Sequence, residues 1–395
     1  MLNQDKARRF FISMHKRLLR EDSMKQQLVY FSQSPIHYRK NIYLLMDKEL
    51  AMDFYFGDSR PGKIAPFDVT QLKHFKGTLH NINCGPFYWQ RGVLKLLRSD
   101  YTDIITPGDT YCLSTWALLF FAKWHKKRVY LWTHGAYGNE HGLKLYLTKK
   151  RVKLCAGVFL YGNYAKQLLL KYGADEKKLH VIYNSLDYDN QIGLREKVSK
   201  ESPYIEHFNN KCKNLIFIGR LTRIKKLDQL IKAVSILKEK RHNVNLTFVG
   251  DGEERARLQG LTKELNLEQQ IWFYGACYDE LQKSELLYHA DLCVSPGNVG
   301  LTAMDAMSFG TPVISHNNML NQMPEVEAIE EGKTGGYFKE NDIDSLADSI
   351  EKWFNSNYLR DDIRRNCYKV IDEKYNPHKQ VELLHNVINK NNGSK

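Results

Sequence analysis

The chain has 395 residues, of which 43% are hydrophobic and 26% charged, and its formal net charge is +13. This length exceeds one ordinary hydrophobic core and this composition excludes a disordered chain, so we expect two globular domains. The seven cysteines are scattered, with no C-x-x-C pair, which predicts reduced thiols and no zinc site. The first residues lack the apolar core of a signal peptide, and the longest apolar run, near residues 113–122, is too short to span a bilayer. We therefore expect a cytoplasmic protein.

The positive charge is concentrated in the first half of the chain. Residues 1–200 contain 33 Lys and Arg against 17 Asp and Glu, whereas residues 201–395 contain 25 against 28. This imbalance predicts an anionic partner for the first half, either nucleic acid, a phosphorylated acceptor or an acidic membrane surface, and an ordinary solvated surface is the alternative. A basic amphipathic helix over residues 1–20 and the cations of residues 144–153 are candidates for contact with anionic lipid; an ordinary helix packed on the domain is the other interpretation of residues 1–20.

The hydrophobic pattern predicts strands that alternate with helices along the whole chain. In the first half, strands are expected at 27–31, 52–56, 103–105, 129–132, 157–161 and 181–182, and helices at 38–49, 89–98, 114–124, 142–150 and 163–171. In the second half, strands are expected at 215–218, 244–249, 271–274 and 291–294, and helices near 227–237, 256–265 and 279–288. Repeated units of this kind predict parallel, doubly wound sheets, so the fold class is α/β.

These elements divide into two domains. We expect a first Rossmann-like domain at residues 1–192, a polar linker at 193–210, and a second Rossmann-like domain at 211–375. A final helix at about 376–390 follows an Asn-Pro break and is expected to pack back on the first domain. Two domains of this class bind their ligand between the carboxyl edges of their sheets.

The first motif of the second domain follows its first strand. Gly219 ends the strand, Arg220 comes next, and Lys225 stands at the start of the following helix. A guanidinium and an ammonium at this edge match two phosphates, because Arg binds them bidentately and Lys adds a compact charge. Such a pair can neutralise a departing diphosphate without a metal ion. The alternative is a basic helix start that is merely solvated.

The second motif spans residues 295–314. Gly297 and Gly300 let the loop backbone approach a ligand closely, and a short helix then begins near Leu301. Asp305 lies about one turn into that helix and is suited to accept hydrogen bonds from sugar or ribose hydroxyls. Gly310 ends the helix and the next strand follows.

Together, these motifs resemble the family 4 glycosyltransferases of GT-B fold, the glycosyl transferases group 1. The resemblance covers roughly residues 214–350, and the first half resembles the family's acceptor domain more loosely. The segments that carry it are Gly219-Arg220-Leu221-x3-Lys225, Val249-Gly-Asp-Gly252, Tyr274-Gly275, Ala290-Asp291-Leu-x-Val-Ser295-Pro296, Gly300-Leu301-x3-Asp305-Ala-Met307-x2-Gly310-x-Pro312-Val-Ile314, Pro324-Glu325 and Gly332-Lys-Thr-Gly335.

The resemblance implies a nucleotide-sugar donor site in the second domain. Arg220 and Lys225 would contact the donor diphosphate, the backbone of residues 298–301 would hold the transferred sugar and the phosphates, and Asp305 would hold the ribose. The segment from Tyr274 to Cys277 would lie beside the base. The donor-binding residues implied in this way are Gly219, Arg220, Lys225, Tyr274, Asn298, Val299, Gly300, Leu301 and Asp305.

The chain departs from the family in one residue of its signature pair. The family's Glu-x7-Glu is Gly297-x7-Asp305 here, so the first carboxylate is missing and the second is shortened. The first Glu reaches the donor sugar in the family, so its loss suggests a donor with fewer or differently placed hydroxyls, such as a deoxy-sugar. On that hypothesis, Gly297→Glu should lower the activity on the native donor.

His134 is the candidate catalytic residue of the first domain, beside Arg220 and Lys225 in the second. It ends a predicted strand and resembles the family's strand-end histidine near the donor sugar. A neutral imidazole there can donate a hydrogen bond to a sugar hydroxyl or to developing charge, whereas a backbone carbonyl is the alternative partner. Glu140 and His141 are expected to form a capping cluster, with an acceptor-side base as the alternative.

The sequence therefore predicts an anomer-retaining, metal-independent glycosyltransferase of the hexosyltransferase type, with no cofactor. It would move a sugar from a nucleotide-sugar to a saccharide or lipid-linked acceptor in cell-surface glycan biosynthesis, in the cytoplasm or at the inner face of the membrane. Two alternatives stay open, a sugar-nucleotide epimerase of the same fold and a basic nucleic-acid-binding protein, although the second lacks any nucleic-acid-binding signature and we expect no nucleic-acid partner.

Overall fold

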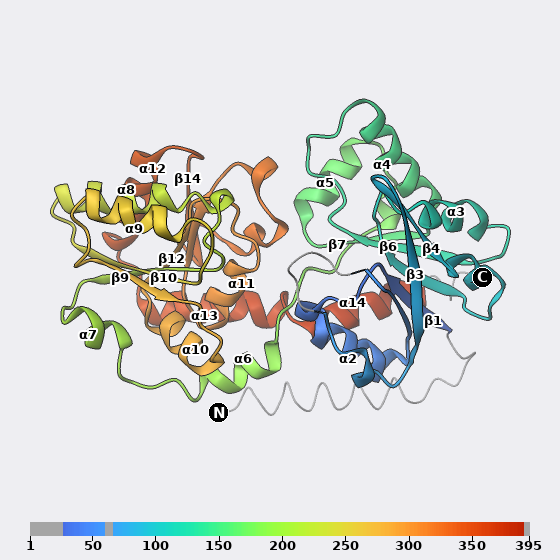
Figure 1. The fold of residues 1–395 in the computed structure, drawn as a ribbon, viewed down its shortest axis with the longest axis horizontal. Coiled ribbons are helices and arrows are strands. Elements are labelled where there is room, and N and C mark those ends of the chain that lie inside the picture. The colour runs from blue at the N-terminus through green and yellow to red at the C-terminus, as the bar shows by residue number, and fades with distance from the viewer. Residues whose placement is uncertain (1–26, 60–65, 391–395) are drawn as a thin grey trace.

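The protein has two α/β domains that lie side by side, as shown by a computed structural model that describes residues 27–59 and 66–390 (Figure 1). The predicted helix over residues 1–20 falls outside these residues. All seven cysteines are free thiols. Within the described residues, none of the helices has the length and apolarity that crossing a bilayer requires.

The first domain is built on an eight-stranded sheet in the order β4-β3-β2-β1-β5-β6-β7-β8. All neighbours are parallel except β3 and β4, which are antiparallel. The strands are β1 (Leu28–Ser32), β2 (Asp53–Gly57), β3 (Phe75–Cys84), β4 (Phe87–Arg91), β5 (Asp103–Pro107), β6 (Arg128–Thr133), β7 (Gly157–Leu160) and β8 (Leu179–Val181). The helices are α2 (Lys40–Leu50), α3 (Leu113–Ala122), α4 (Gly142–Leu154) and α5 (Asn163–Lys171), with 3-10 turns η1 (His37–Arg39), η2 (Val69–Gln71), η3 (Val93–Arg98) and η4 (Glu176–Lys178).

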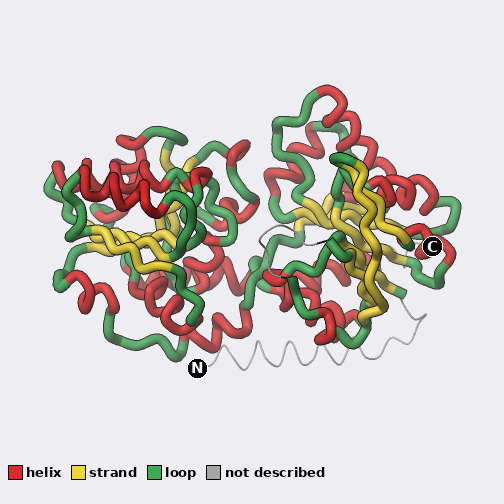
Figure 2. Tube along the Cα trace, viewed as in Figure 1, coloured by secondary structure: helices red, strands yellow, loops and turns green. Residues whose placement is uncertain are grey.

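The second domain is built on a six-stranded, fully parallel sheet in the order β11-β10-β9-β12-β13-β14. Its strands are β9 (Lys213–Ile218), β10 (Val244–Val249), β11 (Ile271–Gly275), β12 (Leu292–Ser295), β13 (Val313–His316) and β14 (Gly335–Phe338). Its helices are α6 (Tyr188–Arg195), α7 (Pro203–Phe208), α8 (Leu227–Glu239), α9 (Arg255–Glu264), α10 (Glu280–His289), α11 (Thr302–Ser308), α12 (Ile343–Phe354) and α13 (Arg360–Glu373), with 3-10 turns η5 (Arg223–Lys225), η6 (Met319–Asn321) and η7 (Pro324–Ala328). The strand and loop pattern of both domains is visible in Figure 2.

These two sheets confirm the predicted fold class of two doubly wound, Rossmann-like domains. Each sheet is covered on both faces, which explains the near-continuous apolar strands at its centre. Val29 and Phe31 of β1, for example, contribute to one core of the first domain, and Leu28 and Tyr30 contribute to the other.

The helix predicted at residues 89–98 is wrong. Residues 87–91 are strand β4, and only residues 93–98 are helical, as a 3-10 turn. In β4 buried Tyr88 and Gln90 alternate with exposed ends, whereas β3 carries mostly exposed polar residues and therefore has little apolar pattern to reveal it. The pair extends the sheet at its edge, where local pattern is weakest.

The second domain begins before the polar segment that was predicted as a linker. Helix α6 packs on α10 and α11 of the second domain. Within residues 193–210, α7 places the fully buried side chain of Tyr204 in the core of that domain, where its hydroxyl donates to the carbonyl of Leu286 at 2.6 Å. Because the segment is mostly polar, its composition did not indicate that Tyr204 is buried.

The last helix, α14 (Pro377–Lys390), returns to the first domain and packs against α2 (Figure 1). Val381, Leu384 and Ile388 are buried in the same apolar cluster as Ile42 and Met46. The C-terminal end of the chain thus completes the core of the domain with which the chain begins.

Candidate active site

The two sequence motifs of the second domain meet at the carboxyl edge of its sheet. The Lys225 ammonium donates to the carbonyl oxygen of Asn298 at 2.6 Å and to its side-chain Oδ1 at 2.9 Å. In return, the amide of Gly297 donates to the carbonyl of Lys225 at 3.0 Å. The loop after β9 and the loop after β12 therefore form one connected unit.

Arg220 and Lys225 differ in their surroundings. The side chain of Arg220 is exposed and makes no hydrogen bond or ion pair with the rest of the described chain. Lys225 is half-buried, and this burial, together with the nearby charge of Arg220, lowers the pKa of its ammonium to about 8. Among the described carboxylates, Glu325 is the one close enough to affect the pKa of Lys225. The two cations therefore outnumber the carboxylates, and the resulting electropositive site suits a diphosphate.

Gly297 is required by close backbone packing. A Cβ atom at this position would lie 2.1 Å from the carbonyl oxygen of Ile224 and 2.8 Å from the Cα of Lys225. A carboxylate at residue 297, as in the family pattern, would need this loop to separate from the Lys225 loop. The missing side chain is thus linked to the contact that holds the two motifs together.

Gln322 binds the loop of residues 298–301, which we call the donor loop, on the side opposite Lys225. No sequence pattern predicted this role. Its Oε1 accepts a hydrogen bond from the amide of Val299 at 2.9 Å, and its Nε2 donates to Ser315 Oγ at 2.8 Å and to the carbonyl of His316 at 2.9 Å. The Ser315 hydroxyl in turn donates to the carbonyl of Ser295 at 2.9 Å. Because Gln322 is buried, these bonds fix the loop backbone rigidly.

Asp305 and Tyr274 are both held by neighbouring side chains. Asp305, on α11, accepts a hydrogen bond from Gln191 Nε2 at 3.1 Å and lies 3.9 Å from the Lys283 ammonium. Burial raises the pKa of its carboxyl, and Lys283 opposes this rise. Tyr274 donates its hydroxyl hydrogen to Gln282 Oε1 at 2.9 Å at the end of β11.

His134 ends β6 and faces the second domain across the cleft. Its ring lies 4.8 Å from that of Tyr161 and 5.8 Å from that of Tyr137. Burial and the charge of Arg39 lower the pKa of the imidazole to about 4, so the ring is neutral at neutral pH. Its Nδ1 is buried and has no hydrogen-bond partner, so the alternative of a backbone carbonyl partner at that atom is not observed.

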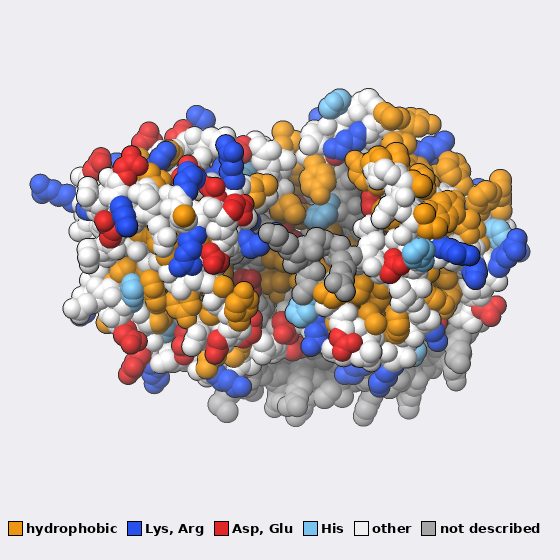
Figure 3. Space-filling view, viewed as in Figure 1, with side chains coloured by type: hydrophobic (Ala, Val, Ile, Leu, Met, Phe, Trp, Pro, Cys, Tyr) orange, Lys and Arg blue, Asp and Glu red, His pale blue; other side chains and the backbone are white. Residues whose placement is uncertain are grey.

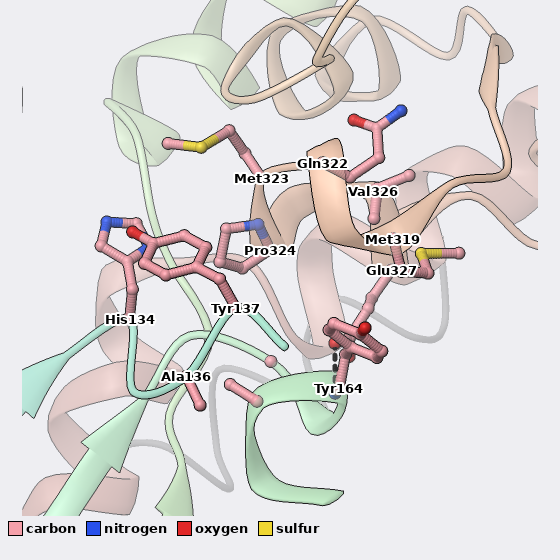
Figure 4. Close-up of a pocket in the computed structure, with 12 residues that line it drawn as sticks. His134, Ala136, Tyr137, Tyr164, Met319, Gln322, Met323, Pro324, Val326 and Glu327 are labelled. Carbon is pink, nitrogen blue, oxygen red and sulfur yellow. Dashed lines mark hydrogen bonds between the residues drawn. The ribbon is translucent and has the colours of Figure 1, made fainter. Parts of the chain in front are cut away.

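A pocket between the domains is lined by His134, Tyr137 and Tyr164 from the first domain and by Gln322 and Met323 from the second (Figure 4). Gln322 connects this pocket to the loop of residues 298–301, because it also accepts the hydrogen bond from the amide of Val299. Most of the other lining residues are apolar.

Two carboxylates of the turn η7 connect the domains. Glu327 accepts hydrogen bonds from the amides of Asn163 and Tyr164, at 2.6 and 2.7 Å, and so caps helix α5 of the first domain. Glu325 accepts one from Asn184 Nδ2 at 2.7 Å, and burial raises the pKa of its carboxyl. Side chains of the second domain therefore connect it to the first domain by hydrogen bonds.

Residues 199–370 match the family model of the glycosyl transferases group 1. The match lies within the second domain and covers less than half of the chain. An uncharacterized glycosyltransferase of Methanocaldococcus jannaschii is 28% identical over 210 residues, which are 52% of each chain. The lipopolysaccharide 1,6-galactosyltransferase of Escherichia coli is 23% identical over 297 residues, 71% of this chain and 74% of the relative. The alignments cover only about half or less of the first curated relatives.

The fold of this protein is also found in solved structures. HepE of Anabaena in complex with UDP superposes with a TM-score of 0.67, at 16% identity, over 92% of this chain and 100% of that chain. The likeness confirms the predicted GT-B arrangement of two Rossmann-like domains.

The structure brings most of the predicted site residues to one cleft. Gly219, Arg220, Lys225 and residues 298–301 lie together at the carboxyl edge of the second sheet, and His134 reaches the same cleft from the first domain. Glu140 accepts from the amides of Tyr137 and Gly138, both at 2.9 Å, as the predicted capping cluster. Among residues 27–59 and 66–390, no group of three His, Cys, Asp or Glu side chains is arranged to hold a metal ion.

Proposed function

We propose that the protein is a glycosyltransferase that moves a sugar from a nucleotide diphosphate donor to a hydroxyl of an acceptor. The acceptor oxygen bonds to the anomeric carbon while the bond from that carbon to the diphosphate breaks, and the hydroxyl proton leaves with the diphosphate. The observation that carries this proposal is the exposed, unpaired Arg220 beside the half-buried Lys225 at the edge of the sheet. Both cations can stabilise the charge that develops on the leaving group.

The first domain contributes a neutral group to this reaction. Because its pKa is about 4, His134 can donate a hydrogen bond to a sugar hydroxyl without adding a positive charge beside the reacting carbon. The apolar walls of the pocket exclude water from the anomeric centre, which favours the acceptor over hydrolysis.

We further propose that the transfer retains the anomeric configuration, moves a hexose and proceeds without a metal ion. Retention follows from the family resemblance, and Arg220 with Lys225 supplies the positive charge that a metal would otherwise bring. The anomeric configuration of the product, read by nuclear magnetic resonance, tests retention. Activity that EDTA abolishes and Mg²⁺ restores would contradict metal independence.

The acceptor is proposed to be a saccharide or a lipid-linked intermediate of cell-surface glycan synthesis. Support comes from the lipopolysaccharide galactosyltransferase to which the chain is similar over most of its length. A uridine nucleotide is the first donor to test, because HepE was solved with UDP.

A thermal-shift screen with UDP, GDP, TDP and their sugars tests the donor site. We expect one nucleotide family to raise the Tm of the wild type, and Arg220→Ala to lose most of that rise because a bidentate phosphate contact is removed. Arg98→Gln, an exposed arginine of the first domain, is the matched control and should respond as the wild type does. If none of the nucleotides stabilises the wild type, the donor-site assignment fails.

We also propose that the protein works at the inner face of the membrane, with the first domain as the docking side. Helices α3 and α4, which pack together, expose a set of large apolar side chains that we call the α3–α4 face (Figure 3). Trp124 is 78% and Leu143 71% exposed. The other members are Phe120, Phe121 and Tyr146. Residues 110–155 contain nine Lys and Arg against a single acidic residue, Glu140. Aromatic side chains surrounded by cations suit an anionic bilayer surface.

Sedimentation with phosphatidylcholine vesicles, with and without phosphatidylglycerol, tests this docking. We expect the wild type to bind only the anionic vesicles and the variant Trp124→Ser/Leu143→Ser to lose most of that binding. Tyr278→Ser/Leu359→Ser removes comparably exposed side chains from the second domain and should bind normally. Equal binding of both variants would remove the α3–α4 face from the proposal, and a further variant lacking residues 1–20 would show whether that segment binds instead.

A further inference from the structure

Arg39 holds an unusual position at the carboxyl edge of the first sheet. It is the last residue of turn η1, directly before α2, and so lies in the loop that follows the central strand β1. Its guanidinium carbon lies 4.8 Å from the centre of the Trp132 ring of β6 and 5.7 Å from that of Tyr161. The side chain is therefore enclosed by aromatic rings at the same edge as His134.

The partners of this guanidinium carry no charge. Its Nη1 donates to the Tyr30 hydroxyl at 3.4 Å, and its Nη2 donates to the Tyr161 hydroxyl. Burial raises the pKa of Tyr161, which keeps that hydroxyl protonated. In the described part of the chain, Arg39 has no carboxylate within ion-pair distance.

Other enclosed arginines of this protein donate to carboxylate or carbonyl oxygens. Arg128 donates from Nε and Nη2 to the two carboxylate oxygens of Asp103, each at 2.6 Å. The buried Arg151 donates to the carbonyl oxygen of Gly108. Removing a charge from water is costly, and the only hydrogen-bond acceptors that the Arg39 side chain meets within the described residues are two neutral hydroxyls.

Two further polar atoms near Arg39 lack partners. The indole Nε1 of Trp132, a hydrogen-bond donor only, and Nδ1 of His134 are both buried and unbonded. Trp132 is the ring on which Arg39 stacks, and His134 is close enough for Arg39 to lower its pKa. A buried donor without an acceptor is rare in folded proteins, and here it accompanies an unpaired cation.

The cluster lies beside the pocket between the domains. His134 lines that pocket, and the Arg39 side chain next to it is only partly buried.

We propose that Arg39, with the indole N–H of Trp132, binds an oxyanion of the acceptor substrate next to His134. The word acceptor rests on the proposed function; the anion site itself does not. A guanidinium presents paired N–H groups that fit two oxygens of a phosphate or a carboxylate, and the indole adds a third donor. A phosphate would come from a lipid-linked acceptor, and a carboxylate from an acidic sugar.

The alternative is a purely structural arginine that holds η1 on the aromatic cluster. Such a residue would affect stability but not the binding of anions. The experiment must therefore read anion binding directly, at a donor site already filled so that Arg220 and Lys225 do not contribute.

Calorimetric titration of the full chain, saturated with the nucleotide found in the thermal-shift screen, provides this reading. Inorganic phosphate and glucuronate are the two probes, and the tighter of the two identifies the source of the oxyanion. We expect saturable binding to the wild type, at least tenfold weaker binding to Arg39→Gln, and an intermediate loss in Arg39→Lys, which keeps the charge but not the paired geometry. Arg98→Gln is the control and should bind as the wild type does. Normal binding by Arg39→Gln, or no binding of either probe to the wild type, would overturn the proposal.

A second measurement covers the case in which Arg39→Gln does not fold. The indole N–H resonance of Trp132, assigned with Trp132→Phe, should shift on phosphate addition to the wild type, whereas a purely structural cluster would leave it unmoved. Failure of the proposed function is distinguishable, because it would appear as absent nucleotide stabilisation while phosphate still moved this resonance in the nucleotide-free protein.

Discussion

The two sides of the cleft differ in how far their polar groups are already satisfied. On the second domain, the donor loop is bonded on both sides, to Lys225 through Asn298 and to Gln322 through Val299. On the first domain, Arg39 lacks a counter-charge, and buried nitrogens of Trp132 and His134 lack partners. The donor loop of the second domain is thus preorganised by its own hydrogen bonds. The first domain, in contrast, has hydrogen-bonding groups that no other part of the described chain satisfies. With the anion site that we propose, selectivity for the acceptor would lie in the domain with the weaker sequence motifs.

The largest effect is expected from a substitution that disrupts the contact between the donor loop and the Lys225 loop. In Gly297→Ala, the new Cβ would meet the carbonyl of Ile224 at 2.1 Å, so the two loops must separate. We expect a loss of about 1–3 kcal/mol in unfolding free energy, measured by urea denaturation, and a strong fall in nucleotide affinity. Gly300→Ala is the control in the same loop, since its Cβ would make only an ordinary contact with Met323, at 3.8 Å, and its φ is 52°, and it should lose about 1 kcal/mol. Equal losses would mean that the loop contact is not rigid.

Low pH is expected to destabilise the first domain through the buried imidazole of His134. The folded protein holds His134 with a pKa of about 4, whereas an unfolded histidine has its ordinary pKa of 6.5, so protonation favours the unfolded chain as the pH falls through this window. Lowering the pH from 7 to 5 should remove about 2 kcal/mol of stability through this residue. Five other histidines also have lowered pKa values, so the relevant quantity is the difference between wild type and His134→Asn. Parallel pH profiles would show that His134 is not held neutral.

Nucleotide binding to the second domain is expected to weaken at alkaline pH through Lys225. With a pKa of about 8, Lys225 loses its proton just above neutrality when no ligand is bound, and a bound diphosphate would restore it. Nucleotide affinity should therefore fall by up to about tenfold between pH 8 and 9. Isothermal titration at several pH values measures this slope, and Lys225→Met should bind more weakly with a flat profile over that range. The same slope in both proteins would assign the titration to another group.

The smallest effect concerns the contact between the two sides. Glu327→Gln keeps the size of the side chain but removes the charge that caps α5, so we expect about 1 kcal/mol less stability. Small-angle scattering should also show a larger radius of gyration as the cleft opens. Glu331→Gln, an exposed carboxylate in the turn that follows, is the control. An unchanged radius would indicate that other contacts hold the domains together.

The sequence predicted the second domain better than the first. Its strands carry continuous apolar runs, and the residues of each motif lie within 20 positions of one another. Local pattern was therefore enough to predict that Lys225 and the 298–301 loop lie at one edge of the sheet. The edge strands β3 and β4 were missed because β3 is largely exposed and polar. The role of Gly297 could not be predicted, because the sequence shows a missing carboxylate but not the backbone that occupies its place.

Contacts over long sequence distances lay beyond sequence reasoning. Glu327 caps a helix whose first residue, Asn163, is 164 positions away, and no spacing rule connects them. The role of Gln322 likewise depends only on what surrounds it in space. His134 was found because strand ends are where a doubly wound sheet presents its functional groups.

The return of α14 to the first domain has a consequence for folding in the cell. The ribosome releases Val381, Leu384 and Ile388 only after the whole second domain has been made, so the first domain to be synthesised is the last to close its core. The second domain can fold as soon as it emerges, while the earlier half waits with an open apolar surface beside α2. Loss of a few C-terminal residues would then damage the acceptor side of the cleft, at the opposite end of the sequence, before it affected the donor side.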